Sequence, residues 1–130
     1  MKSKLEIYAL SVCFAAMICV VISSGIGGYA FVRVLNPELT MSSYQYDQYQ
    51  TNDAYWARDN YQYADDTTPV NRPSEKELTA KRVALFAIAK NSEKREGMQT
   101  LTGSFIFLFT GLITLLIHLV VAKKSRVKDI

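Results

Sequence analysis

The sequence has few of the residues from which catalytic and metal sites are built. Its 130 residues contain one histidine and two cysteines, and no HExxH, Walker A, CxxC or Asn-x-Ser/Thr sequence occurs in them. A catalytic triad or a zinc site needs several such groups brought together. The sequence therefore predicts a protein that is not an enzyme and that holds no metal or cofactor.

Apolar residues, in contrast, are plentiful near both ends of the chain. Ile7–Val32 contains no charged residue, and His118 is the one ionisable group in Leu101–Ala122. As helices these runs are about 39 and 33 Å long, against about 30 Å of hydrocarbon in a bilayer. They predict an integral membrane protein with two transmembrane helices. A cleavable signal peptide is the alternative for the first run, because Gly28-Tyr29-Ala30 resembles a cleavage site.

Basic residues flank the two runs towards the ends of the chain. By the positive-inside rule they place both termini in the cytoplasm and the middle of the chain outside it, in a bacterial inner membrane. The residues that would determine this topology are Lys2, Lys4, Lys123, Lys124, Arg126 and Lys128. The opposite orientation stays open, since it is favoured by Lys90, Lys94 and Arg95.

Small residues recur along each predicted span. In lipid, helices associate through close backbone approach and polar contacts, which such residues permit. The first row repeats at intervals of four residues. The second row runs from Thr100 to His118 in alternating steps of four and three, and it includes Phe107. The predicted helix-packing face comprises Ser11, Ala15, Cys19, Ser23, Gly27, Ser104, Gly111, Thr114 and His118. This face closes a two-helix hairpin, binds helices of another protein, or does both.

The chain between the spans is acidic and rich in Tyr and Gln as far as Pro73. It shows no helical or strand period and predicts an irregular loop. Its aromatic side chains suit either a membrane interface or contact with a partner. These partner-contact candidates are Tyr44, Tyr46, Tyr49, Tyr55, Trp56, Tyr61 and Tyr63.

A helix is predicted to begin after Pro73, because Ser74 and Glu77 form a capping box. No proline interrupts the chain beyond it, so a charged stem should run into the second span. Apolar residues on this stem, from Val83 to Ala89, need cover from the Tyr-rich loop or from another subunit. The predicted fold is an all-α membrane protein in five segments: 1–35, the first transmembrane helix with its flank; 36–73, the loop; 74–100, the stem; 101–122, the second transmembrane helix; and 123–130, a basic tail.

Two segments carry a resemblance to known proteins. Leu35-Asn36-Pro37-Glu38-Leu39-Thr40 follows the first span, and Arg72-Pro73-Ser74-Glu75-Lys76-Glu77-Leu78-Thr79 opens the stem. In this arrangement the chain resembles a family of small, uncharacterised bacterial membrane proteins with two spans. The resemblance implies the architecture and a bacterial source, with no activity, site or cofactor.

These features predict a non-enzymatic accessory or assembly subunit of a larger membrane complex of the channel, transporter or respiratory type. The expected partners are membrane lipid and other integral membrane subunits, or further copies of the same chain. Neither nucleic acid nor a small-molecule substrate is expected, since bases alternate with acids along the stem. Two alternatives are a self-assembling small pore or transporter and a surface sensor or adhesin that uses the Tyr-rich loop.

Overall fold

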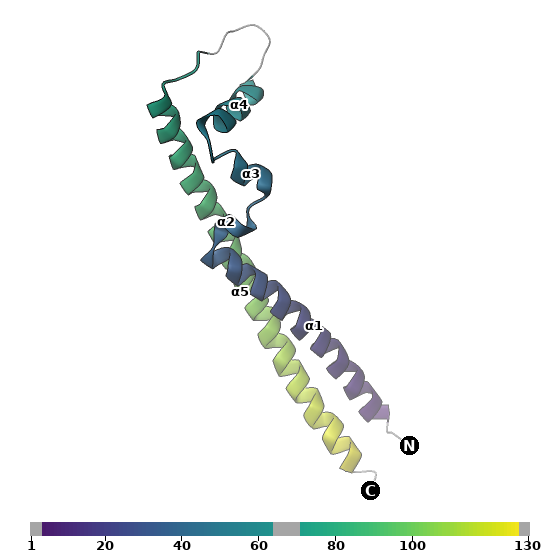
Figure 1. Ribbon diagram of the computed structural model, residues 1–130. Helices are drawn as coiled ribbons and strands as arrows, with labels where there is room; N and C mark the ends of the chain where they lie inside the picture. Colours follow the sequence, from purple (N-terminus) through teal and green to yellow (C-terminus); the bar gives the residue numbers. More distant parts are fainter. Residues whose placement is uncertain (1–3, 64–70, 128–130) are drawn as a thin grey trace. The chain divides into compact units, whose positions relative to one another are not determined.

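The described chain is helical along most of its length (Figure 1). The computed structural model describes residues 4–63 and 71–127, without the side chains of 60–63, 126 and 127. Two long helices, α1 (Lys4–Leu35) and α5 (Glu75–Val127), flank three short ones in the sequence. The short helices are α2 (Pro37–Thr40), α3 (Ser43–Asp47) and α4 (Asn52–Tyr63). No strand occurs in the described ranges.

The long helices are the two predicted from the apolar runs. Both α1 and α5 are long and apolar enough to cross a membrane. Helix α1 ends where Asn36-Pro37 predicts: the Asn36 N–H donates to the carbonyl of Val32 at 2.8 Å, and Pro37 opens α2. At the start of α5, Ser74 Oγ accepts the N–H of Glu77 at 3.4 Å. The helix then continues past Gly97 to Val127, as the absence of proline predicts.

The chain forms two compact units. The hairpin unit consists of the described parts of Met1–Phe31 and Gly97–Ile130. The loop–stem unit is Val32–Glu96, and residues 75–96 of α5 are its stem.

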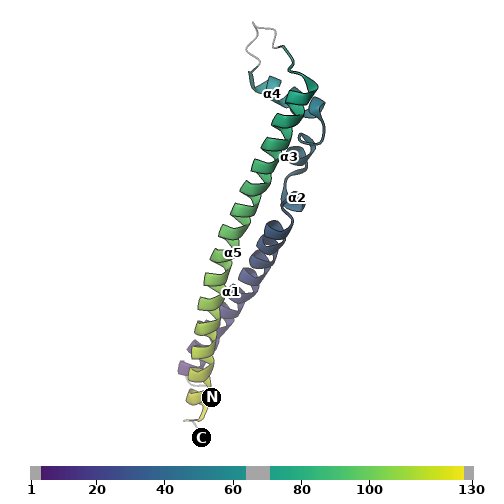
Figure 2. The same ribbon diagram turned by 90° about the vertical axis from the view of Figure 1, so that its left-hand side faces the viewer.

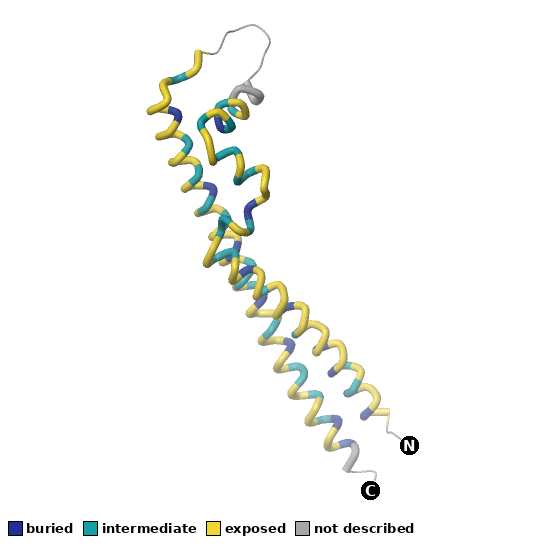
Figure 3. Tube along the Cα trace, viewed as in Figure 1, coloured by how far each residue is buried: buried dark blue, intermediate teal, exposed yellow. Residues whose placement is uncertain are grey.

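In the hairpin unit, α1 and α5 pack along a seam of small residues. Figure 3 shows the buried positions recurring on the facing sides of the two helices. Steps of three and four average 3.5 residues, the repeat of a coiled-coil seam. On α1 the seam is Glu6, Ala9, Cys13, Ala16, Val20, Ser23, Gly27 and Ala30. On α5 it is Gly97, Leu101, Ser104, Leu108, Gly111, Leu115, His118, Ala122 and Ser125.

In the loop–stem unit, α2, α3 and α4 lie along one side of the stem (Figures 1 and 2). Leu78, which is 1% exposed, and Ala89 are buried on that side. We call α2, α3 and α4 with their connecting turns the covering segment. Its helices contradict the prediction of an irregular loop. Ser42 Oγ accepts the N–H of Gln45 at 3.2 Å to open α3, and Thr51 Oγ1 accepts the N–H of Ala54 at 3.1 Å to open α4. Side-chain caps thus start short helices whose sequences have no apolar period.

Candidate functional site

The predicted row of small residues on α1 does not form one face. Ser23 and Gly27 lie on the seam, whereas Ser11, Ala15 and Cys19 are exposed. Each step of four residues advances a helix by about 40°, so the row turns by about 160° between Ser11 and Gly27. A partner helix in contact with the end of such a row cannot also touch its beginning. Within the hairpin unit, the seam therefore includes only Ser23 and Gly27 of this row.

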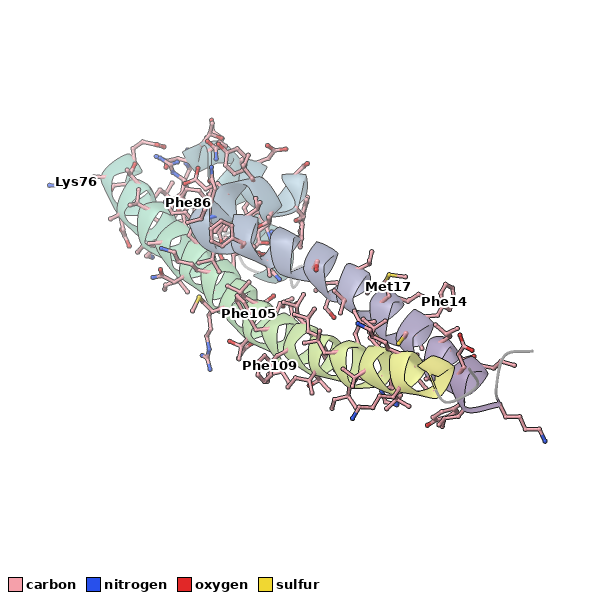
Figure 4. All side chains as sticks on the ribbon, turned by 90° about the horizontal axis from the view of Figure 1, so that it is seen from below. Phe14, Met17, Lys76, Phe86, Phe105 and Phe109 are labelled. Atoms are coloured by element: carbon pink, nitrogen blue, oxygen red, sulfur yellow. The ribbon has the colours of Figure 1, made fainter. Side chains whose placement is uncertain are left out.

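The α5 stripe matches the seam more closely. Ser104, Gly111 and His118 lie on it, and Thr114 is half-buried beside it. Phe107, which the alternating spacing included, is 68% exposed, and Leu108 takes its place. The large ring lies outside a seam of small side chains. Phe14, Met17 and Phe109 also point away from the helix pair (Figure 4).

At two glycines, α1 and α5 approach each other closely. A Cβ added to Gly27 would lie 3.3 Å from Cβ of Ser104. A Cβ added to Gly111 would lie 2.9 Å from Cγ2 of Val20 and 3.6 Å from the carbonyl oxygen of Ala16. The missing side chain at Gly111 is thus a condition for this packing.

Near the chain termini the seam carries His118. Its Nδ1 donates to the carbonyl of Thr114, one turn earlier, at 2.9 Å. Its ring lies 6.2 Å from the ring of Tyr8 on α1, tilted by 60°. These contacts give the histidine a packing role within the hairpin unit.

A groove opens beside the seam in the hairpin unit. Its volume is about 400 Å³, and its lining is almost entirely apolar or small: Ser23, Ser24, Gly27, Gly28, Phe31, Leu101, Ser104, Phe105 and Leu108. Ser23 and Ser104 are only 8% and 9% exposed. Neither hydroxyl has a hydrogen-bond partner among the described residues.

The aromatic candidates of the Tyr-rich segment are mostly engaged within the loop–stem unit. The rings of Tyr46 and Tyr49 lie 6.2 and 5.4 Å from the ring of Phe86 on the stem. Tyr55 is 8% exposed, and burial, followed by the charge of Asp59, raises the pKa of its phenol. These three side chains therefore cover the stem.

The remaining aromatic candidates differ in how exposed they are. Tyr44 is exposed, with the guanidinium of Arg58 4.8 Å above its ring, and Trp56 is half-buried. Tyr61 and Tyr63 belong to α4, but their side chains lie outside the described set.

Arg82 ties the covering segment to the stem. Its Nε donates to Oδ1 of Asn52 at 2.9 Å, and its Nη1 donates to the carbonyls of Tyr49 and Gln50 at 2.5 and 3.0 Å. These carbonyls belong to the turn between α3 and α4, which has no ladder to satisfy them. This residue is not among those predicted from the sequence. Two bases lie between Leu78 and Phe86, and the available indication was that Arg82 alone is four residues from each of these apolar side chains.

Ion pairs stabilise the covering segment at two places. Before it and in its first helix, Arg33 pairs with Glu93 and, at 2.6 Å, with Glu96, while Lys90 pairs with Glu38 at 3.1 Å. At the start of α4, Asp53 pairs with Arg72 at 2.7 Å, and Arg72 also pairs with Glu75 at 2.6 Å.

Glu75 also accepts a hydrogen bond from the side-chain amide of Asn52 at 2.8 Å. That bond, with the pairing to Arg72 second, lowers the pKa of the Glu75 carboxyl from its ordinary value. Because Asn52 is held by Arg82 as well, one amide connects the start of α4 with two turns of the stem.

The opposite side of the stem is apolar and uncovered. Its exposed residues recur at helical spacing: Ala80, Val83, Ala84, Ala87 and Ile88. Lys76 lies on this side one turn before them, with Lys94 and Arg95 beyond them, and no described residue forms an ion pair with any of the three. Lys76 points away from the helices in Figure 4. We call these eight residues the outward stem face.

Three of the residues predicted to set the topology are described with their side chains. Lys4, Lys123 and Lys124 are exposed. Lys2, Lys128 and the side chain of Arg126 lie outside the described set.

Within the described ranges, no three His, Cys, Asp or Glu side chains come close enough to hold a metal ion. Comparison of the chain with protein-family models, with curated proteins and with solved structures finds no match.

Proposed function

We propose that this protein is a non-enzymatic accessory subunit of a larger membrane complex, anchored by α1 and the apolar part of α5. On this proposal it contacts a partner through the outward stem face. One observation carries the proposal: one side of the stem is covered by the chain's own short helices, while the other carries a continuous apolar strip that is exposed.

The strip is larger than the scattered apolar residues of an ordinary surface. Single exposed apolar side chains need no explanation, but a contiguous patch indicates an interaction site. Val83 and Ile88 are 56% and 62% exposed, and three alanines lie between or beside them. Alanine lets a second helix approach closely, so the strip suits a helix better than a loop.

Charge narrows the kind of partner. Lys76 at one end of the strip, and Lys94 and Arg95 at the other, have no carboxylates to pair with among the described residues. A partner helix with an apolar ridge and acidic residues near both ends would complement this face. Two copies of this face in parallel would instead bring like charges together.

The alternative of a surface sensor or adhesin has less support than its seven aromatic candidates suggest. Tyr46, Tyr49 and Tyr55 are packed within the loop–stem unit, so they offer little surface to a ligand. The alternative of a pore is also less favoured, because the His118 ring donates to the backbone carbonyl of Thr114 on its own helix and lies beside Tyr8 in the hairpin unit.

The proposal is tested by adding a charge to the outward stem face. Val83→Glu should abolish recovery of a membrane protein that co-purifies in mild detergent and is identified by mass spectrometry. Ser92→Glu is the matched control, because Ser92 is exposed on the same helix beside the strip and gains the same charge. A photo-crosslinking residue at Ala87 should join the same partner.

Either of two results would overturn the proposal. One is that the wild-type protein purifies with no other protein. The other is that Val83→Glu and Ser92→Glu recover the same proteins in equal amounts.

A further inference from the structure

The groove in the hairpin unit lies beside a second pair of small residues that the hairpin itself does not use. On α1, Ser23 and Gly27 lie on the seam, and Gly27 approaches Ser104 closely. Ser24 and Gly28 have the same spacing on the neighbouring side and are exposed, and a Cβ on Gly28 would meet nothing within 4 Å. A serine and a glycine four residues apart, the arrangement that allows α5 to approach α1, thus occur again on the side of α1 that lines the groove.

The groove also holds two hydroxyls without partners. Ser23 and Ser104 line it, are more than nine-tenths buried and have no hydrogen bond to any described residue. In lipid an unmade hydrogen bond has no water to replace it. A lipid chain would fill the apolar part of the groove and leave both hydroxyls unbonded.

We propose that the groove docks a second copy of this chain, with Ser24 and Gly28 of each α1 in contact across a two-fold axis along the membrane normal. This inference rests on the membrane location in the proposed function. Copies inserted in the same orientation carry these residues at the same depth, so the surface meets itself. The contact is continuous with the α1–α5 seam, because Gly27 and Ser104 belong to both.

The hydrogen bonding is complementary in this arrangement. Ser24 Oγ donates its proton to the carbonyl of Val20 at 2.7 Å, which leaves lone pairs on that oxygen as acceptors. The hydroxyls of Ser23 and Ser104 each have a proton to donate. Ser24 of one copy therefore supplies what these two groups of the other copy lack, while Phe31 and Phe105 wall the groove.

The test compares two glycines three residues apart. Gly25 and Gly28 are both exposed on α1, and a Cβ on either would meet nothing within 4 Å. Only Gly28 lines the groove. Gly28→Ile should weaken the dimer by about tenfold or more, measured by energy transfer between labelled full-length chains in liposomes, and Gly25→Ile should leave it unchanged.

Disulfide trapping gives an independent readout. In native membranes, with Cys13 and Cys19 replaced by alanine, oxidation should join two copies of the Gly28→Cys variant and no copies of the Gly25→Cys variant. Equal trapping of both variants would overturn the proposal, since it would report random collision. An unchanged dimer in Gly28→Ile would overturn it in favour of lipid in the groove, and trapping to a different protein would overturn it in favour of another occupant.

Failure of this inference is distinguishable from failure of the proposed function. Val83→Glu alters the outward stem face and leaves the groove intact, whereas Gly28→Ile does the reverse. Extraction of the wild-type protein by alkaline carbonate would show that it is not integral to the membrane, and both proposals would then fall.

Discussion

The two units are held together by contacts of different kinds. In the hairpin unit many of the packed residues are small, and the two helices approach closely where Gly27 lies beside Ser104 and Gly111 beside Val20. In the loop–stem unit the packed residues are large, with two tyrosine rings on Phe86 and the Arg82 guanidinium on backbone carbonyls. The same helix, α5, contributes to both.

The difference follows the solvent proposed for each unit. Lipid offers no hydrophobic gain for bringing apolar helices together, so stability there comes from backbones that approach closely. In water, burying rings and the stems of long basic side chains is favourable in itself. The contrast therefore supports a membrane location for the hairpin unit and an aqueous one for the loop–stem unit.

The largest expected loss of stability comes from a substitution that disrupts the seam of small residues. Gly111→Ala should cost about 1–3 kcal/mol, because the added Cβ overlaps Cγ2 of Val20, and Gly111→Leu should cost more. The free energy of unfolding in detergent micelles measures this. Gly103→Leu is the control, since nothing lies within 4 Å of its added Cβ. Equal losses in both leucine variants would contradict the described seam.

The next effect concerns the aromatic contacts of the loop–stem unit. Phe86→Ala should cost about 2–3 kcal/mol, less than for a fully buried ring because Phe86 is half-buried. Trp56, the only tryptophan, lies in α4 and reports the release of the covering segment by fluorescence. Val83→Ala, on the uncovered side of the same helix, should change stability by less than about 0.5 kcal/mol.

A smaller loss of stability is expected when only the guanidinium of Arg82 is replaced. Arg82→Lys keeps the charge but cannot reproduce three bonds to Asn52, Tyr49 and Gln50, and should cost about 1–2 kcal/mol. Amide hydrogen exchange should become faster across residues 49–54. Arg95→Lys makes the same change at an exposed, unpaired position and should have no effect, so faster exchange in both variants would count against the described role.

The smallest effect depends on pH. The pKa of Glu75 is lowered in the folded unit, first by Asn52 and then by Arg72, so the folded form binds a proton less readily than the unfolded one. Its contribution is present above the ordinary value of 4.5 and is lost as pH falls through the folded pKa. Glu75→Gln should remove that part of the acid destabilisation in a pH series of unfolding curves. An identical pH profile for the variant would show that other carboxyls are responsible.

The sequence was sufficient to predict those features of the fold that depend on neighbouring residues. The two apolar runs, the break at Asn36-Pro37 and the cap at Ser74 each depend on residues within a few positions, and the described structure has all of them. The seam was harder to predict. Ser11 and Gly27 share a spacing of four with Ser23, but a pair of packed helices follows a spacing of 3.5, and only the packing shows which residues remain in contact.

The helices of the Tyr-rich segment depend on distant residues. Tyr49 finds its ring partner at Phe86 and its carbonyl's donor at Arg82, 33 residues later. No window of the segment itself contains either group. The Tyr-rich composition therefore predicted an aromatic surface, whereas the fold turns part of that surface inward.

The seam has a consequence for how the protein is made. The Cys13 thiol contacts the carbonyl of Leu115, 102 residues later in the chain. At a ribosomal rate of about 5–20 residues per second, α1 exists for roughly 5–20 s before that part of α5 is synthesised. In that interval the small-residue side of a nascent α1 has no α5 to pack against, whereas α1 helices of chains made earlier are already present. Order of synthesis thus leaves the seam side of α1 without its partner helix until α5 is made.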